Sequence, residues 1–290
     1  MNFTNKMLTT KNESLKFAYR QIRYTLIHRN FNGITSPLRK LPDFLVLGGK
    51  RCGTTSLFQF LRQHPDISNP TVDHMGFFDD NYKLGINYYK SFFPLKTKRS
   101  VIKLDYDVTT SYLTSPYVPE RVSKYMPDIK MIILLRNPVT RAWSEYHSNL
   151  RGDPSYGKFE TYIDNELKEL ETINFSEKVL KNDYDLKDPR NNYLKKGLYV
   201  DFLKKWFNFF PKKNFLILPT ELFAKNEKLV YSQIFEFLGL PNSEIKNTNR
   251  MEKGNYDPID EKLRLKLDIF FKPKNLELFQ LLGTQFDWEN

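Results

Sequence analysis

The 290-residue chain contains one cysteine and only four histidines. A single cysteine, Cys52, excludes an intramolecular disulfide and a zinc site made of several cysteines. The sequence also lacks any apolar run near the ~18 residues that a membrane-spanning helix needs. Because the amino-terminal stretch has neither the apolar core nor the small-residue cleavage site of a signal peptide, we expect a cytoplasmic protein.

Negative charge is scarce in the first part of the chain. Overall, 45 Lys and Arg against 34 Asp and Glu give a net charge of +11. Residues 1–51 alone hold ten basic and two acidic side chains, a net charge of +8. Such an excess favours an anionic partner, which can be a nucleotide, a sulfated or phosphorylated polymer, a nucleic acid or a membrane surface.

The amino-terminal segment reads as an arm. Residues 14–30 have apolar side chains at helical spacing and basic side chains on other faces, so they predict an amphipathic helix. This helix either rests on an anionic membrane surface as a peripheral contact or docks on the domain. The stretch "NGITSPLRKLP" (32–42) reads as a linker. We therefore divide the chain into a basic arm, residues 1–41, and a domain, residues 42–290.

From residue 42 onward, predicted strands alternate with predicted helices. The strands are expected at 44–48, 101–105, 131–136 and 214–219. Helices are expected at 54–63, 138–150, 159–170, 197–210 and 229–238, followed by two helical stretches near the carboxyl end. Residues 176–195 read as an exposed loop or lid. This alternation predicts an α/β fold of three layers, P-loop-like, with a central parallel sheet flanked by helices on both faces.

The segment "LVLGGKRCGTTSLFQFL" (45–61) reads as a strand, a glycine-bearing loop and a helix. Gly48 and Gly53 have the spacing of a nucleotide triphosphatase loop, but Thr54 follows where such a loop has lysine. The cations, Lys50 and Arg51, lie within the loop instead. Backbone N–H groups of the loop and of the following helix amino terminus can bind a phosphate, with hydroxyls from Thr54, Thr55 and Ser56.

The residue at the end of a second predicted strand argues against ATP as the ligand. Triphosphatases need a carboxylate for magnesium, usually an aspartate at the end of another strand. The best candidate, "MIILLR", ends instead in Arg136. Arginine repels a metal ion but grips a phosphate with two parallel hydrogen bonds. The sequence therefore predicts a site for two separate phosphate groups that requires no metal.

These motifs resemble those of the nucleotide-dependent sulfotransferases, closest to the bacterial and glycan (heparan-type) branch, which use 3′-phosphoadenosine 5′-phosphosulfate (PAPS). "LVLGGKRCGTTSL" is similar to the loop for the 5′-phosphosulfate. "LLRNPVTRAWSEY" (134–146) is similar to the 3′-phosphate motif, which implies that Arg136 and Ser144 hold that phosphate. "NRMEKGNY" (249–256) resembles the late loop that closes over the nucleotide, which implies Lys253 and Gly254. The resemblance extends from about residue 42 to residue 288.

The resemblance implies direct in-line transfer of a sulfuryl group to a hydroxyl or amine of a carbohydrate or other small acceptor. Arg51 aligns with the loop lysine of the family, which implies that it stabilises the leaving oxygen; the adjacent Lys50 can share or take that role. Cys52 reads as a small residue tolerated in the loop rather than as a nucleophile. The implied nucleotide contacts are Lys50, Arg51, Cys52, Gly53, Thr54, Thr55, Ser56, Arg136, Ser144, Lys253 and Gly254.

The acceptor must lose a proton, so a base is expected. Glycan-type relatives place a glutamate in a stretch similar to "DHMGFFDD" (73–80), and alignment on Phe77, Phe78 and Asp79 puts His74 at that position. Histidine can serve as a base at neutral pH. The alternatives are Asp73, Asp105 and Asp107.

A second position that differs from the family's pattern concerns the acceptor. Relatives often carry a lysine at the position of Val108, where it can contact an acidic glycan. An acceptor of the heparan kind is therefore less expected here. Asp107 and Thr109 either line the acceptor pocket or pack at a strand end.

Two other functions remain open from the sequence. One is a P-loop kinase or triphosphatase, which the missing lysine and Arg136 disfavour. The other is a non-catalytic polyanion-binding or membrane-binding protein that uses the basic arm, which leaves the paired phosphate motifs without a role. We expect no nucleic-acid partner. The sequence identifies neither the acceptor nor the oligomeric state.

Overall fold

A computed structural model describes residues 32–68, 74–97, 103–188, 190–244 and 256–288 of the chain. Within them a parallel sheet has the strand order β2-β1-β3-β4. The strands are β1 (Phe44–Gly48), β2 (Tyr106–Val108), β3 (Lys130–Leu135) and β4 (Phe215–Pro219). All three strand pairs are parallel, so the strands end at the same edge of the sheet. The predicted α/β class with a parallel sheet is confirmed.

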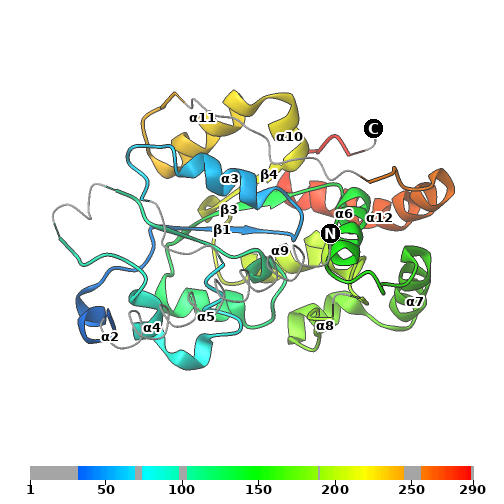
Figure 1. Cartoon of the computed structure of the whole chain (residues 1–290), viewed down its shortest axis with the longest axis horizontal. Helices are drawn as coiled ribbons and strands as arrows, with labels where there is room; N and C mark the ends of the chain where they lie inside the picture. The colour runs from blue at the N-terminus through cyan, green and yellow to red at the C-terminus, as the bar shows by residue number, and fades with distance from the viewer. Residues whose placement is uncertain (1–31, 69–73, 98–102, 189, 245–255, 289–290) are drawn as a thin grey trace, which may run out of the picture.

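Helices cover both faces of this sheet (Figure 1). One face packs against α3 (Thr54–Leu61), α10 (Thr220–Lys225) and α11 (Glu227–Leu238). The other face packs against α5 (Val118–Tyr125), α6 (Pro138–Gly152) and α9 (Tyr199–Phe207). Around these lie α2 (Asn32–Thr35), α4 (Ile86–Lys90), α7 (Phe159–Thr172), α8 (Phe175–Lys181), α12 (Glu261–Leu282) and the short 3₁₀ helices η2 (Ser36–Leu38), η3 (Tyr82–Leu84), η5 (Thr110–Leu113), η6 (Lys195–Gly197) and η7 (Lys212–Asn214).

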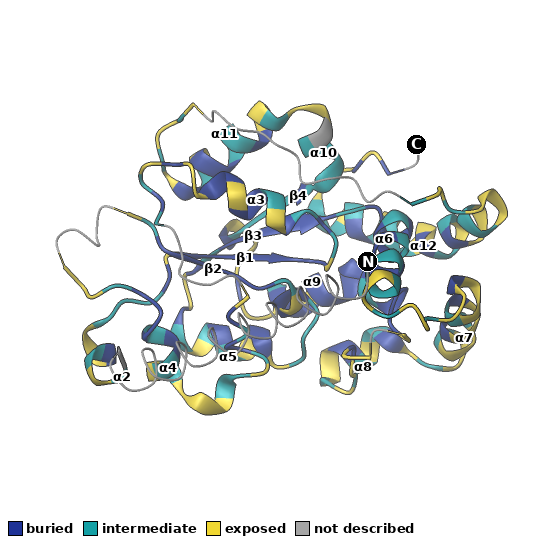
Figure 2. Cartoon of the chain, in the orientation of Figure 1, coloured by how far each residue is buried: buried dark blue, intermediate teal, exposed yellow. Residues whose placement is uncertain are grey.

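The apolar strands fill two cores because successive side chains point to opposite faces of a sheet. Val46 and Ile132 pack with the residues of α3 and α11. Their neighbours Leu47 and Ile133 pack with α5, α6 and α9. The central strands are buried on both faces (Figure 2). This burial explains why the two strand sequences are continuously apolar rather than alternating.

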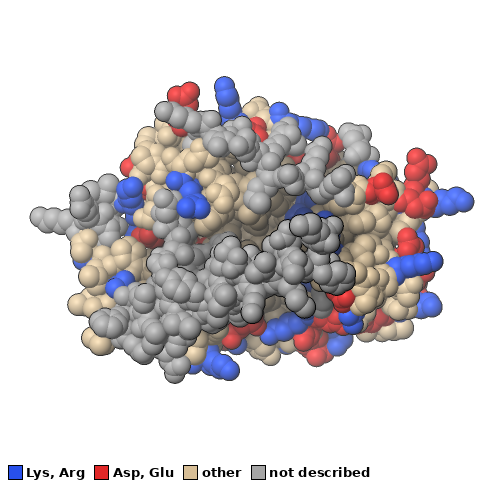
Figure 3. Space-filling model, in the orientation of Figure 1, with Lys and Arg blue, Asp and Glu red and all other residues tan. Residues whose placement is uncertain are grey.

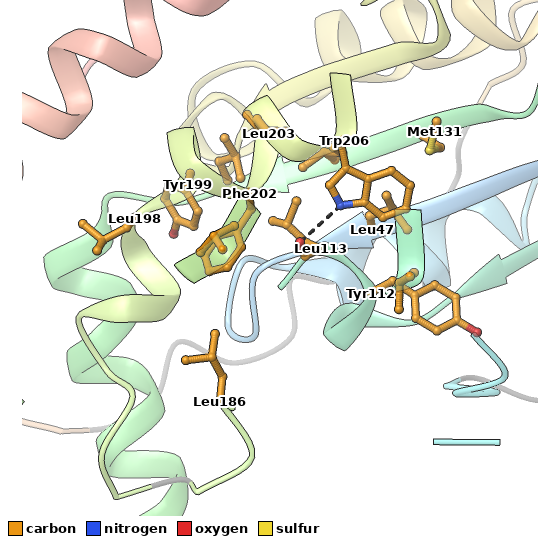
Figure 4. Close-up of a cluster of buried hydrophobic side chains, with 14 of the residues drawn as sticks. Leu47, Tyr112, Leu113, Met131, Leu186, Leu198, Tyr199, Phe202, Leu203 and Trp206 are labelled. Carbon is orange, nitrogen blue, oxygen red and sulfur yellow. Dashed lines mark hydrogen bonds between the residues drawn. The ribbon is translucent and has the colours of Figure 1, made fainter. Parts of the chain in front are cut away.

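Trp206 of α9 occupies the centre of the larger core. It is fully buried, and its indole nitrogen donates a hydrogen bond to the carbonyl oxygen of Leu113 at 3.2 Å (Figure 4). Leu47 of β1 and Met131 of β3 belong to the same core cluster. A buried indole with its N–H satisfied contributes a large apolar area without an unpaired polar group.

Four predicted segments differ from the structure. The strand expected at 101–105 is displaced to Tyr106–Val108, with residues 101 and 102 outside the described part. Asp107 in this strand is fully buried because three hydroxyl groups donate to its carboxylate, an arrangement that an apolar pattern does not reveal. The two predicted carboxyl-terminal helical stretches form the single helix α12, which contains Pro273.

The other two differences concern predicted loops. The expected linker at 32–42 contains α2 and η2, and Arg39 fastens it by donating to the carbonyl oxygen of Phe93 at 2.6 Å. The expected loop at 176–195 begins within α8 and ends in buried residues. Both segments are polar enough to suggest loops, yet they bury a few residues against the domain.

The described surface carries charges of both signs. On the face drawn in Figure 3, lysine and arginine side chains are interspersed with aspartate and glutamate. Several form exposed pairs, for example Lys266 with Asp164 at 2.8 Å. In the same described part, no helix is both long enough and apolar enough to span a membrane.

Replacement of Trp206 by alanine tests the importance of this core. Because the change removes a fully buried indole and leaves a cavity, we expect a loss of about 3–5 kcal/mol in the free energy of unfolding. Urea denaturation followed by circular dichroism measures the loss. Phe209→Ala is the matched control, since Phe209 is 40% exposed and its truncation should change stability far less. Equal losses for the two variants would contradict the assignment of Trp206 to the centre of the core.

Candidate active site

The predicted phosphate loop lies between β1 and α3, at the carboxyl edge of the sheet. Two of its glycines are required by geometry. A Cβ atom on Gly48 would lie 2.8 Å from Thr54 Cγ2 and 3.2 Å from the carbonyl oxygen of Leu134, so Thr54 and β3 together leave no room for a side chain. Gly53 has φ = 86°, a conformation that glycine adopts without strain. The loop therefore packs closely on β3 and turns sharply into α3.

Three backbone amides at the start of α3 face no partner of their own helix. The first helical hydrogen bond runs from the N–H of Leu57 to the carbonyl oxygen of Gly53. The preceding N–H groups belong to Thr54, Thr55 and Ser56, and within the described residues no side chain caps them. Free amides at a helix amino terminus bind anions well.

Arg51 and the second phosphate motif meet at this point. Arg51 Nε donates to Ser144 Oγ on α6 at 3.1 Å. Arg136, which follows β3, donates from Nη1 to the carbonyl oxygen of Arg51 at 3.4 Å and from Nε to Thr140 Oγ1 at 3.1 Å. The two motifs, 85 residues apart in the sequence, thus form one cluster with two guanidinium groups and a serine hydroxyl.

The backbone of Arg51 is in the left-handed region, with φ = 72°. For a residue with a side chain this conformation costs about 1–2 kcal/mol. Such strain is found at sites where neighbouring contacts fix the backbone. Here the side chain of Arg51 donates to Ser144, and its carbonyl oxygen accepts from Arg136.

Cys52 points into the core rather than toward the cluster. Its thiol is fully buried and lies 3.8 Å from the hydroxyl of Tyr199, and its N–H donates to the carbonyl oxygen of Gly49. Burial raises the pKa of the Cys52 thiol to about 11, although the charge of Arg141 opposes the rise. The thiol is therefore neutral near pH 7. Cys52 shapes the loop, and its side chain is turned away from any ligand held by the open amides.

Two residues that the sequence analysis missed join the motifs. The hydroxyl of Tyr199 donates to the carbonyl oxygen of Arg136 at 2.9 Å, so one side chain of α9 contacts both the loop and the end of β3. The hydroxyl of Thr220 contacts the carbonyl oxygens of Cys52 at 2.6 Å and of Leu135 at 3.0 Å. The one signal for Thr220 was its place directly after a predicted strand, at the edge where the loop lies.

The start of α6 is fixed from the far end of the chain. The side chain of Asn137 accepts from the N–H groups of Val139 and Thr140 and caps the helix. Its amide nitrogen donates to the carbonyl oxygen of Trp288 at 2.7 Å. Glu221 in turn accepts from the backbone N–H of Asn137 and from the indole of Trp288. The helix that carries Ser144 therefore begins in a closed hydrogen-bond network.

His74 lies at the end of β2. Its side chain is exposed, its φ is 60°, and its N–H donates to the carbonyl oxygen of Val108 at 2.9 Å. Since β2 is parallel to β1, this places the residue at the same edge of the sheet as the loop. The alternative base Asp73 lies outside the described residues.

The two other carboxylates considered as bases are placed differently. Asp105 precedes β2, at the opposite edge of the sheet, and pairs with Lys40 at 2.7 Å. Asp107 is fully buried and accepts hydrogen bonds from Tyr89, Tyr112 and Thr109. Burial raises the pKa of Asp107 to about 6, against the effect of these hydrogen bonds. Neither carboxylate is open to an acceptor, and Thr109 packs at the strand end with Asp107.

The network around Asp107 supports the loop that carries His74. The hydroxyl of Tyr112 donates to Asp107 and also accepts from the N–H groups of Phe77 and Phe78, at 2.8 and 3.2 Å. The buried carboxylate therefore holds Phe77 and Phe78 through one tyrosine. This is a structural role that the sequence analysis left open.

Lys253 and Gly254 lie outside the described residues. The residues that follow them contact α6: the ring of Tyr256 stacks on His147 at a centroid distance of 4.4 Å, and Trp143 Nε1 donates to the carbonyl oxygen of Asp257 at 2.9 Å. Both contacts flank Ser144 on the helix. In the described part of the chain, no group of three or more His, Cys, Asp or Glu side chains could hold a metal ion.

A comparison with known families identifies the family of the chain. The sulfotransferase domain family model matches residues 41–266. The chain belongs to the sulfotransferase family. This sulfotransferase is therefore a transferase enzyme, and the kinase alternative is not favoured.

Individual relatives agree with this assignment. The sulfotransferase is 25% identical over 315 positions to membrane-associated sulfotransferase kil1 of Dictyostelium discoideum, over 86% of this chain and 67% of that protein. It is 26% identical over 275 positions to heparan sulfate glucosamine 3-O-sulfotransferase 6 of Mus musculus, over 87% of this chain and 75% of that protein. The crystal structure of a sulfotransferase from Alicyclobacillus acidocaldarius is similar with a TM-score of 0.65 and 25% identity, over 87% of this chain and 100% of that one.

The buried thiol gives a direct test of the loop geometry. Because the pKa of Cys52 is raised and the sulfur is enclosed, we expect iodoacetamide at pH 8 to label the folded protein about 10²-fold more slowly than the unfolded protein. Mass spectrometry after timed quenching measures both rates, with guanidinium-unfolded protein as the reference. Rapid labelling of the folded protein would show that the loop does not enclose Cys52.

Proposed function

We propose that this sulfotransferase moves the sulfuryl group of PAPS to a hydroxyl, or an amine, of a carbohydrate or other small acceptor. The single observation that supports it most is the cluster of Arg51, Arg136 and Ser144 beside the open amides of α3. A nucleotide with a 5′-phosphosulfate and a separate 3′-phosphate carries two anionic groups that such a cluster can bind. The names of the relatives support a carbohydrate acceptor, since one of them acts on heparan sulfate glucosamine.

In the proposed site, each half of the cluster binds one anion. The amides and hydroxyls of residues 53–56 hold the 5′-phosphate, as free donors at a helix amino terminus can. Arg136 and Ser144 hold the 3′-phosphate. Ser144 accepts from Arg51 through its oxygen and so keeps its own proton to donate to a phosphate oxygen. By resemblance, Lys253 and Gly254 close over the nucleotide.

The proposed transfer is a direct in-line displacement at sulfur. The acceptor oxygen forms a bond to sulfur while the bond from sulfur to the 5′-phosphate oxygen breaks, and the electron pair of the broken bond stays on that phosphate oxygen. Arg51, with Lys50 next to it in the chain, supplies positive charge for the leaving oxygen. His74 accepts the proton of the acceptor. The step needs no covalent enzyme intermediate, and the products are the sulfated acceptor and 3′-phosphoadenosine 5′-phosphate (PAP).

Two further expectations stay predictions. The membrane contact through residues 14–30 concerns residues outside the described part, and the cytoplasmic location is likewise untested. The name of one relative, a membrane-associated sulfotransferase, supports examining the arm for peripheral membrane binding.

Calorimetric titration tests the nucleotide. We expect PAP to bind without magnesium and more tightly than ATP with magnesium. Adenosine 5′-phosphate, which lacks the 3′-phosphate, should bind less tightly than PAP to the wild type. Tighter binding of ATP with magnesium would contradict the proposal.

Arg136→Ala tests the assignment of the 3′-phosphate in the same titration. Loss of a charged hydrogen-bond donor should weaken PAP binding by about 10- to 100-fold. The variant should also lose the preference for PAP over adenosine 5′-phosphate. Arg264→Ala is the control, because Arg264 pairs with Asp268 on the surface of α12. A variant that keeps the full preference would move the 3′-phosphate away from Arg136.

His74→Ala tests the base. We expect turnover of PAPS with an acceptor to fall by about 10²–10⁴-fold, because a positioned base is lost, while PAP affinity stays near that of the wild type. Transfer of labelled sulfate to a panel of hydroxyl and amine acceptors measures turnover, and calorimetry measures affinity. Undiminished turnover would assign the base to another residue.

A further inference from the structure

The two cations of the loop are held by two neighbouring residues of α6. Arg51 Nε lies 3.1 Å from Ser144 Oγ, and Lys50 Nζ lies 3.3 Å from Glu145 Oε1. The two loop side chains therefore lead to different partners although they are adjacent in the sequence. From the sequence, Arg51 was expected at the leaving oxygen, with Lys50 able to share or take that role.

Glu145 is an unusual carboxylate for a surface helix. It is fully buried, and three cations surround it: Arg141 Nη1 at 2.6 Å from Oε2, and Lys196 Nζ at 3.0 Å and Lys50 Nζ at 3.3 Å from Oε1. Burial alone would raise the pKa of Glu145, but the charges of Arg141, Lys196 and Lys50 outweigh it and lower the pKa to about 2. The group is thus ionised throughout the neutral range.

The three cations differ in what they contribute. The side chain of Arg141 is fully buried and that of Lys196 is 12% exposed, so each depends on Glu145 for compensation of its charge. Lys50 is 46% exposed and water can solvate its ammonium group. Arg141 and Lys196 alone can neutralise the buried carboxylate. The contact from Glu145 to Lys50 therefore fixes the loop more than it stabilises the core.

The contact between Lys50 and Glu145 also lies next to Arg51, whose backbone is strained. Arg51, with its positive φ, directly follows Lys50, and Asn149 Oδ1, one turn along α6 from Glu145, lies 3.5 Å from Lys50 Nζ. The loop is thus held at two adjacent residues. Lys50 contacts Glu145, and Arg51 donates a hydrogen bond to Ser144. Loss of the contact between Lys50 and Glu145 should let the strained backbone of Arg51 relax.

We propose that Glu145 is a positioning residue: it holds Lys50 against α6, fixes the strained turn at Arg51, and leaves Arg51 as the loop cation for the leaving oxygen. This rests on the proposed transfer from PAPS, and it changes the role of Lys50 from a direct cation to an anchor. Arg141, whose guanidinium lies 2.6 Å from the other carboxylate oxygen, keeps Glu145 in place. The charge of Lys50 then matters through its contact with Glu145.

A double-mutant cycle between Lys50 and Glu145 tests the proposal. In the wild-type background, Lys50→Met should lower kcat/KM for PAPS and weaken PAP binding by about 5-fold, the size expected for a half-exposed charged pair. In the Glu145→Gln background the same change should alter both quantities less than about 2-fold, because the partner is already lost. An equal effect of Lys50→Met in both backgrounds would overturn the proposal.

A second series keeps the test valid if Glu145→Gln does not fold. Lys50→Arg retains charge and donors, Lys50→Gln retains a donor without charge, and Lys50→Met retains neither. An anchor predicts activities in the order Arg, Gln, Met, with the Arg variant near the wild type. Equal losses of 100-fold or more in kcat for the Gln and Met variants would make Lys50 a direct cation and overturn the proposal.

Lys196→Met is the matched control. It removes another partner of Glu145, but one that is not on the loop. It should lower the urea midpoint while it leaves kcat/KM for PAPS near the wild-type value. A loss of activity like that of Lys50→Met would favour a general charge effect and contradict the role of Lys50 as an anchor.

The double-mutant cycle is measured both as PAP affinity and as the rate of sulfuryl transfer. A protein that binds PAP without transferring sulfate would contradict the proposed function, while the affinity cycle still decides the role of Glu145.

Discussion

The parallel pairing of β1 with β3 is the constraint on which the site depends. The register places Gly48 opposite Leu134, so the loop after β1 and the arginine after β3 leave adjacent strands at one edge. The absence of a Cβ atom on Gly48 lets the two chains approach there. Side chains from α6, α9 and α10 then join the two strand ends through hydroxyl groups and a carboxylate. A shift in register of β3 by one residue would move the phosphate motif and turn its apolar side chains to the wrong faces.

The sequence predicted those parts of the site that are local in the chain. The loop, the helix start after it and the Arg136–Ser144 motif each occupy a short stretch with a recognisable spacing, and each lies on the expected element. The supports could not be predicted, because they come from distant segments: Tyr199 is 147 residues from Cys52, and Thr220 is 168 residues from it. A tyrosine in an apolar helix or a threonine after a strand has many possible roles until its neighbours are known.

The fold was predicted best where hydrophobic periodicity is strong. The central strands β1 and β3 are continuous apolar runs, and both were found within one residue of their observed bounds. The edge strand β2 was displaced because its central residue is an aspartate, which burial normally excludes unless its oxygens are satisfied. Here Tyr89, Thr109 and Tyr112 satisfy them. Thr109 and Tyr112 lie close to Asp107 in the chain, but Tyr89 comes from α4, and a strand pattern read along one segment does not contain that contact.

The anchoring of Trp288 has a practical consequence for handling the protein. Its carbonyl oxygen and indole are bonded to Asn137 and Glu221, so a residue near the carboxyl end of the chain helps to set the helix that carries Ser144. A shortened version that lacks Trp288 would lose both contacts and would disturb the start of α6 from a distance. Expression vectors for crystallography or screening should therefore leave residues 286–288 intact and separate any carboxyl-terminal fusion by a flexible spacer.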